Sequence, residues 1–161
     1  MNALSADELL AWNEHTANGW RTLLQKNPQA LALPSDIRES NTVADVVQHI
    51  VAVELRFAER LAGRTETSYE QIAKDSVAAL FATHDRAIAL LRATLALPGY
   101  AWEEVVEFAT RSAGVWRVSR RTMFVHALMH GIRHWAQLAT LLRHQGIRAE
   151  QGGDYLLMGR Q

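Results

Sequence analysis

The chain has 161 residues, 48% of them hydrophobic and none of them cysteine, and its 17 basic and 17 acidic residues balance to a net charge of zero. This length and apolar content exclude a disordered polymer and predict a single domain over residues 1–161 with its own hydrophobic core. The zero net charge argues against nucleic-acid binding through a broad basic face, and the lack of cysteine excludes disulfides, a cysteine nucleophile and a thiolate metal site.

The first predicted helix spans about residues 6–25. Ser5 is its candidate N-cap, and Glu8 stands three residues later, where the second side chain of a capping box binds back to the cap. The pair Asn27-Pro28 is expected to end this helix, because proline disrupts helical hydrogen bonding.

The second predicted helix spans about residues 42–62, between a cap at Asn41 or Thr42 and a stop at Gly63. Its apolar residues recur at intervals of three and four, which is the spacing of one buried helix face. They are Val43, Val46, Val47, Ile50, Val53, Phe57 and Leu61.

A third helix is predicted over residues 77–95 and is ended by Pro98-Gly99. Its start is less sharply defined, because Ser68 with Gln71 forms an earlier candidate capping box.

The segment between residues 100 and 117 changes its pattern from helical to extended. Its apolar residues flank Ser112-Ala113-Gly114, which predicts a small β-hairpin. These residues are Trp102, Val105, Val106, Phe108, Val115, Trp116 and Val118.

The fourth predicted helix spans about residues 120–144, with Ser119 as its cap and Gly146 as its stop. After it, the apolar run at residues 155–158 is expected to dock back onto the other helices. Four long amphipathic helices, with a small hairpin between the third and the fourth, predict an all-α four-helix bundle.

No stretch of the sequence reaches the ~18 uncharged apolar residues of a membrane span, so no membrane association is expected. Residues 1–7 lack a basic region followed by an apolar run, so a secretory signal is not expected. Together with the lack of cysteine, these features favour a cytoplasmic location.

Three of the seven histidines, His126, His130 and His134, lie at steps of four on the fourth helix. Two imidazoles at such a step can reach one metal ion, but His126 and His134 are about 80° apart around the helix, too far for all three to do so easily. His49 lies on the apolar face of the second helix, where a polar ring needs a partner. Three imidazoles with an open position suit catalytic zinc, and also nickel, copper or iron.

Each of these histidines has a simpler interpretation. His49 taken alone is more often a hydrogen-bonded core histidine, and the three histidines of the fourth helix could line a partly exposed helix face. A purely structural bundle with buried histidines therefore stays open at this point.

Three stretches of the sequence are similar to a known family. One consists of Trp12-Asn13 and Ala17-Asn18 in the first helix with Asp154-Tyr155-Leu156 in the tail, and the other two lie in the second and fourth helices. His49 is followed by Glu54 five residues later and by a leucine-rich helix end, and residues 126–137 read HALMHGIRHWAQ before a Leu-Arg pair and a glycine. These stretches resemble the second-helix pattern and the HxxxHxxHHRGQ…LR…G helix of the DinB/YfiT-like superfamily of metalloenzymes. The likeness extends over almost the whole chain.

The resemblance implies metal ligands at His49, His130 and His134, binding one divalent ion, with zinc or nickel expected first. It matches His126 to a recurrent family histidine that is usually not a ligand. Arg133 stands where many members have histidine, which changes the wall of the expected pocket and leaves the ligand set intact.

The resemblance also implies a metal-dependent enzyme that acts on a small molecule. Several members use a low-molecular-weight thiol, so thiol S-transfer is the leading expectation, with a metal-dependent hydrolase or a non-catalytic metal or small-ligand binding protein as alternatives. A metal ion with an open position can acidify a bound thiol or water, which suits the first two readings. Members often form homodimers, which this sequence permits.

Three groups of supporting residues are predicted around the metal. The residues expected to orient the ligand rings are Asp45, Glu54 and Gln137. The residues expected to line an aromatic mouth are Trp12, His15 and Trp135. The candidate anchors for an acidic thiol are Arg56, Arg60, Arg117, Arg120, Arg121 and Arg133.

Overall fold

A computed structural model describes residues 4–37, 40–110, 114–149 and 154–159. The four predicted helices are present as α1 (Ala6–Lys26), α2 (Val43–Leu61), α3 (Val77–Leu95) and α4 (Arg120–His144). The hairpin consists of β1 (Val105–Thr110) and β2 (Gly114–Ser119), and short 3₁₀ turns are formed at η1 (Pro28–Ala32), η2 (Tyr69–Gln71) and η3 (Tyr155–Gly159). The fold is therefore mostly helical, with a two-stranded antiparallel sheet that makes the all-α description approximate.

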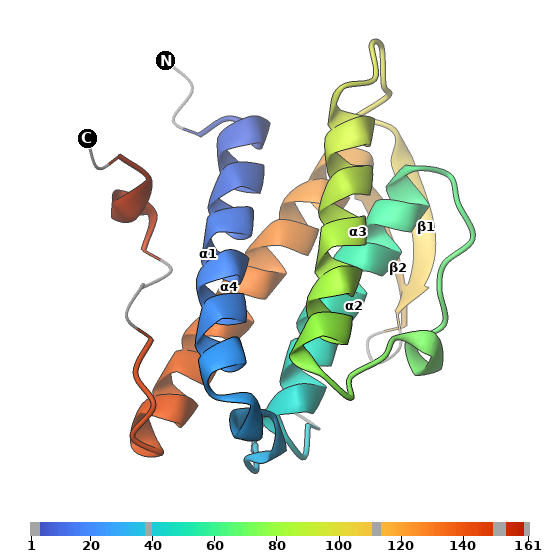
Figure 1. Cartoon of the computed structure of the whole chain (residues 1–161). Coiled ribbons are helices and arrows are strands. Elements are labelled where there is room, and N and C mark those ends of the chain that lie inside the picture. The colour runs from blue at the N-terminus through green and yellow to red at the C-terminus, as the bar shows by residue number, and fades with distance from the viewer. Residues whose placement is uncertain (1–3, 38–39, 111–113, 150–153, 160–161) are drawn as a thin grey trace.

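The four helices pack as a bundle in which α1 and α4 run in one direction and α2 and α3 run in the other (Figure 1). The parallel pair α2 and α3 is joined by a long connection that contains η2. α2 packs against both α3 and α4, and α1 packs against both α3 and α4. The α2–α4 contact is the one that brings the predicted ligand helices together.

Helix capping explains where three of the helices begin. The Ser5 hydroxyl accepts from the backbone N–H of Glu8 at 3.2 Å, and Glu8 accepts from the backbone N–H of Ser5 at 2.7 Å, which confirms the predicted box. Thr42 rather than Asn41 is the N-cap of α2, and Ser119 is the N-cap of α4.

α3 begins at Val77, as predicted, and not at the earlier candidate cap Ser68. Ser68 and Gln71 close only the short turn η2, and the helix begins after Ser76, whose hydroxyl accepts from Ala79 N–H at 3.2 Å. The turn ends at Ile72, which is extended, buried, and bound through its carbonyl by the Gln48 amide at 2.5 Å. Burial of Ile72 in the core therefore holds this segment out of a helix.

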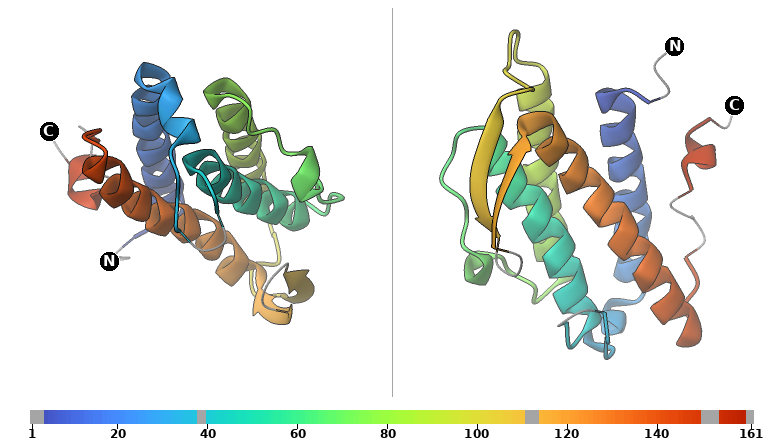
Figure 2. Two further views of the ribbon diagram at one scale, coloured as in Figure 1. Left: turned by 90° about the horizontal axis from the view of Figure 1, so that it is seen from below. Right: turned by 180° about the vertical axis from the view of Figure 1, so that it is seen from behind.

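The predicted hairpin is confirmed, with Phe108 paired to Trp116 and Val106 to Val118 on one face. It lies beside α2, and β2 leads directly into α4 (Figure 2). The Phe108 ring meets the Phe57 ring of α2 edge to face at 5.4 Å, which fixes the hairpin to the bundle. Ser112 and Ala113 of the predicted turn lie outside the described residues.

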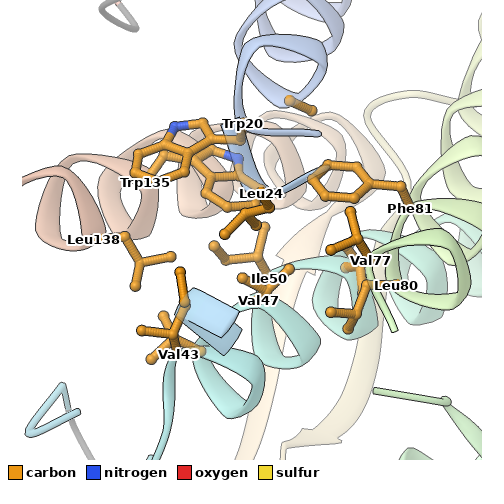
Figure 3. Packing of buried hydrophobic residues seen from close by; sticks show 14 of the residues in the cluster. Trp20, Leu24, Val43, Val47, Ile50, Val77, Leu80, Phe81, Trp135 and Leu138 are labelled. Carbon is orange, nitrogen blue, oxygen red and sulfur yellow. The ribbon is translucent and has the colours of Figure 1, made fainter. Parts of the chain in front are cut away.

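Aromatic rings from three helices form the centre of one of the two hydrophobic clusters (Figure 3). Trp135 of α4 stacks on Trp20 of α1 with ring centroids 5.1 Å apart, and it lies nearly parallel to Phe81 of α3 at 6.2 Å. Rings of this size contribute most to core burial, so Trp135 fixes the rotation of α4 beside His134.

The last described segment, η3, lies beside α1 (Figure 1). Its Tyr155 ring meets Trp12 edge to face at 5.4 Å, so the tail contacts α1 through this residue, whereas Leu156 of the predicted apolar run is 80% exposed. Within the described residues, no helix has the length and apolar character needed to cross a membrane.

Candidate metal centre

The three predicted ligands meet between α2 and α4. His130 and His134 lie one turn apart on α4 and are buried, and His49 of α2 faces them and is half-buried. In the part of the chain that the structure describes, no carboxylate and no fourth histidine joins this group.

The ring nitrogens of these histidines converge closely. The Nε2 atom of His130 lies 3.1 Å from Nε2 of His49 and 3.2 Å from Nε2 of His134. A tetrahedral zinc ion with bonds of about 2.0–2.1 Å holds its ligand nitrogens about 3.3 Å apart. The spacing of the three histidines therefore fits a single ion bound by all three rings.

A hydrogen bond fixes which nitrogen of His134 is free to bind. The Nδ1 atom of His134 lies 2.6 Å from the amide oxygen of Gln137. Because that oxygen can only accept, Nδ1 carries the proton and Nε2 presents a lone pair to the centre. This confirms the predicted ring-orienting role of Gln137.

The electrostatic environment keeps His130 neutral. Burial, followed by the neighbouring His49 and His134, lowers the pKa of His130 to about 2. A neutral imidazole is the form that binds a metal ion, so His130 is ready to act as a ligand throughout the physiological pH range.

The donor set fits a cation better than it fits a hydrogen-bonded core. Hydrogen bonds can satisfy only some of three converging ring nitrogens, whereas one cation accepts a lone pair from each. These histidines are therefore positioned to hold a metal ion, and the donor types alone do not identify the metal.

His126 lies at the edge of the centre rather than in it. Its ring centroid is 5.5 Å from that of His130 and 5.5 Å from that of Phe57, and its side chain is exposed. Burial of part of the ring, together with the charge of Arg133, lowers the pKa of His126.

Of the six candidate anchors, Arg133 is the one placed at the ligands. Its Nη2 atom donates to Nε2 of His134 at 3.3 Å, a hydrogen bond that a metal ion bound by that nitrogen would replace. Arg133 forms no ion pair within the described residues. The other five pair with glutamates instead. Arg56 and Arg60 bind Glu66, Arg117 binds Glu107, Arg120 binds Glu104, and Arg121 binds Glu103.

Two of the predicted ring-orienting residues have other roles. Asp45 caps α2 through Thr42 and forms an ion pair with Lys74, so both of its carboxylate oxygens are bound away from the ligands. Glu54 is fully buried, but its carboxylate is bound by His84 and Asn13 instead of the ligand rings.

Trp135 does not line an aromatic mouth, so this prediction is wrong. Its face of α4 points into the core, where the ring is buried and stacks on Trp20. Trp12 contacts the tail, and His15 is exposed on α1. The ring that borders the centre through His126 is Phe57, which the sequence predicted only as part of an apolar helix face.

His84 and Asn13 were not predicted as site-related residues. His84 interrupts the apolar stripe of Leu80, Ala87 and Ile88 on α3, and a histidine at such a position needs a buried partner. That interruption was the available signal in the sequence.

A comparison with curated proteins finds no match to this chain. The sequence model of the DinB family matches residues 1–158, a range that includes α2, α4 and all three converging histidines. The chain therefore belongs to the DinB family.

Proposed function

We propose that this protein is a metal-dependent enzyme that acts on a small molecule, with His49, His130 and His134 as the ligands of one divalent ion. The observation that supports this most strongly is the convergence of their Nε2 atoms at 3.1 and 3.2 Å with no fourth protein ligand among the described residues. A structural zinc site fills all four positions with protein atoms, whereas a catalytic site keeps one open.

Thiol transfer is the leading reaction in this proposal. A bound divalent ion with an open position lowers the pKa of a thiol or water that coordinates to it. The chain has no cysteine, so the thiol comes from solution. In the reaction, a sulfur–carbon bond forms, the bond from that carbon to its leaving group breaks, and the thiol proton passes to solvent.

The protein residues bind and orient the reactants in this scheme. Gln137 holds the ring of His134 through Nδ1, which keeps Nε2 directed at the centre. Arg133, which has no ion-pair partner in the part of the chain that the structure describes, places its guanidinium beside the same ring, where it can bind the carboxylate of an acidic thiol. Phe57 and His126 supply ring surface at the edge of the centre.

The test is a panel of low-molecular-weight thiols with a chloronitrobenzene or an epoxide as the electrophile, run with chelator-treated and metal-reloaded protein. We expect turnover that requires metal, is lost in His130→Ala, and shows a raised KM for acidic thiols in Arg133→Gln. Arg117→Gln is the matched control, because Arg117 is exposed and pairs with Glu107 on the hairpin.

Turnover that survives both metal removal and His130→Ala would exclude the metal as the catalyst. Absence of turnover with every thiol, together with stoichiometric metal binding, would favour the non-catalytic binding protein, and metal-dependent hydrolysis of an ester would favour the hydrolase. Homodimer formation and a cytoplasmic location remain predictions.

A further inference from the structure

A second polar cluster joins all four helices in the core. It consists of Asn13 of α1, Glu54 of α2 and His84 of α3, whose side chains are 0%, 0% and 1% exposed. His84 Nδ1 lies 2.7 Å from one oxygen of Glu54, and the Asn13 amide donates to the other oxygen at 3.1 Å. The same Asn13 amide donates to the backbone carbonyl of Leu128 on α4 at 3.1 Å.

This cluster contacts α4 at the turn that carries a proposed ligand. Leu128 lies two residues before His130, and Gly131 lies directly after it. On α2, Glu54 is five residues beyond His49, which corresponds to about 7.5 Å along the helix axis. The cluster therefore spans the same two helices as the metal centre, at a neighbouring level.

Gly131 permits the close approach of α4 to this cluster. A Cβ atom at this position would lie 3.0 Å from a carboxylate oxygen of Glu54, 3.3 Å from the Asn13 amide nitrogen and 3.4 Å from a methyl carbon of Ile50. Glycine inside a helix is unfavourable relative to alanine, so its presence here indicates a packing requirement. The carboxylate of Glu54 therefore limits how closely α4 can approach α2.

Stability alone does not explain why this cluster is polar. A buried ion pair is often no more stabilising than apolar side chains of similar volume, because both charges lose their hydration. Here the Asn13 side-chain oxygen and His84 Nε2 also lack hydrogen-bond partners among the described residues. Directional hydrogen bonds depend on angle as well as distance, so they add a constraint on the relative position of the helices that they join.

We propose that Asn13, Glu54, His84 and Gly131 are positioning residues for the metal centre, which set the distance and rotation of α4 on α2 so that His130 and His134 meet His49. This inference rests on the metal centre of the proposed function. It predicts that changes in this cluster alter metal geometry and affinity without removing any ligand.

The experiment compares wild type, Gly131→Ala and Glu54→Gln. Zinc affinity is measured by competition with a chromophoric chelator, and coordination geometry is measured from the visible spectrum of the cobalt(II)-loaded protein. Leu91→Ala is the matched control, because Leu91 is fully buried in the other hydrophobic cluster and its truncation destabilises the core without changing a histidine or a member of the polar cluster. Circular dichroism establishes that each variant is folded before metal is added.

We expect Gly131→Ala and Glu54→Gln to weaken zinc binding by about 10- to 100-fold, the range typical when residues that support metal ligands are changed, and to change the cobalt spectrum. Leu91→Ala should keep the wild-type affinity and spectrum. If either cluster variant does not fold, Asn13→Ala, which removes only the hydrogen bonds to Glu54 and Leu128, is used in its place.

Wild-type affinity and an unchanged cobalt spectrum in the folded cluster variants would overturn the inference while leaving the metal centre in place. An equal loss in Leu91→Ala would also overturn it, since the effect would then follow from stability alone. Wild-type protein that binds neither zinc nor cobalt would instead overturn the proposed function, so the two failures are distinguishable.

Discussion

The bundle contains two polar clusters with a buried histidine, the metal centre with His130 and the core cluster with His84. Their surroundings shift the pKa of the histidine in opposite directions. At the metal centre, His130 is surrounded by other histidines and has a pKa lowered to about 2, first by burial and then by its neighbours. In the core cluster, burial also acts to lower the pKa of His84, but the adjacent Glu54 carboxylate outweighs it and the pKa of His84 is raised. The surroundings of His130 therefore favour its neutral form, and those of His84 favour its protonated form.

This difference follows from the residue beside each ring, which is another histidine at the metal centre and a glutamate in the core cluster. A buried carboxylate beside a histidine favours the imidazolium, and an imidazolium donates from both ring nitrogens and has no lone pair for a metal. Histidines that face one another without a carboxylate stay neutral and direct their lone pairs at a common point. Burial of a histidine is therefore not enough to identify a ligand, and the partner of the ring decides its role.

The largest expected effect concerns the stability of the metal-free protein. His84→Leu leaves the Glu54 carboxylate buried with only Asn13 as a partner, and we expect a loss of about 3–5 kcal/mol in the free energy of unfolding. Glu54→Leu/His84→Leu removes both charges and should cost less than His84→Leu alone. His49→Leu should cost about 1 kcal/mol or less, since no charge is left unpaired. Urea denaturation measures all three, and equal losses in His84→Leu and His49→Leu would break the comparison.

Metal binding should stabilise the folded protein only through the centre formed by His49, His130 and His134. Zinc at 100 times its Kd is expected to add about 2.7 kcal/mol to wild type by mass action, which raises Tm by roughly 5–10 °C for a chain of this size. His130→Ala should show no such shift, and His144→Gln, which changes an exposed histidine at the end of α4, should keep it. The metal-free protein should remain helical by circular dichroism, because the four helices already bury an extensive core. Loss of all helical signal on metal removal would contradict this account.

Local patterns were enough to predict most of the fold. The capping box at Ser5 and the hairpin around Phe108 depend on residues a few positions apart, so the sequence contains their signals directly. The span predicted for the third helix, residues 77–95, is also confirmed. Local patterns could not exclude the earlier start at Ser68, because Ile72 is held extended by burial against α2.

The candidate site was predictable to the same extent. The step between His130 and His134 places both on one helix face, and Gln137 follows on the same face at the next turn. The Glu54 partners could not be predicted, because they depend on how three helices rotate about their axes, and that is set by the packing of the whole core.

A smaller effect is expected from the residue that orients His134. Gln137→Ala removes the acceptor of the Nδ1 proton, and we expect zinc affinity to fall by about 10- to 100-fold with little change in the free energy of unfolding. Thr140→Ala, at an exposed position three residues further along α4, is the control. Equal affinity in the two variants would show that the ring of His134 does not depend on Gln137.

The smallest effect is on the pH dependence of stability in chelator-treated protein. In the unfolded chain both histidines have a pKa of about 6.5. His130 has a pKa of about 2 in the folded protein. Its contribution to the free energy of unfolding is therefore complete above about pH 6.5 and is lost as pH falls below that value. The contribution of His84 has the opposite sign, being complete below about pH 6.5 and lost as pH rises through its raised folded pKa.

Denaturation of wild type, His130→Gln and His84→Gln between about pH 5 and pH 8 tests these signs, with slopes of at most about 1.4 kcal/mol per pH unit for each histidine. In a plot of the free energy of unfolding against pH, His130→Gln should reduce the slope on the acid side. His84→Gln should reduce the slope on the alkaline side. The nearby Asp85 and Arg21 also act on His84, so each is kept unchanged in these variants. The reverse assignment of the two sides would contradict the comparison.

The most direct measurement is X-ray absorption at the zinc edge of the zinc-loaded protein, with and without an added thiol. Without thiol, we predict three imidazole nitrogens at about 2.0–2.1 Å and one further light atom. With thiol, we predict one sulfur at about 2.3 Å, which must come from the added compound because the chain has no cysteine. A fourth imidazole, fewer than three imidazoles, or no sulfur at any thiol concentration would contradict a three-histidine centre with an open position.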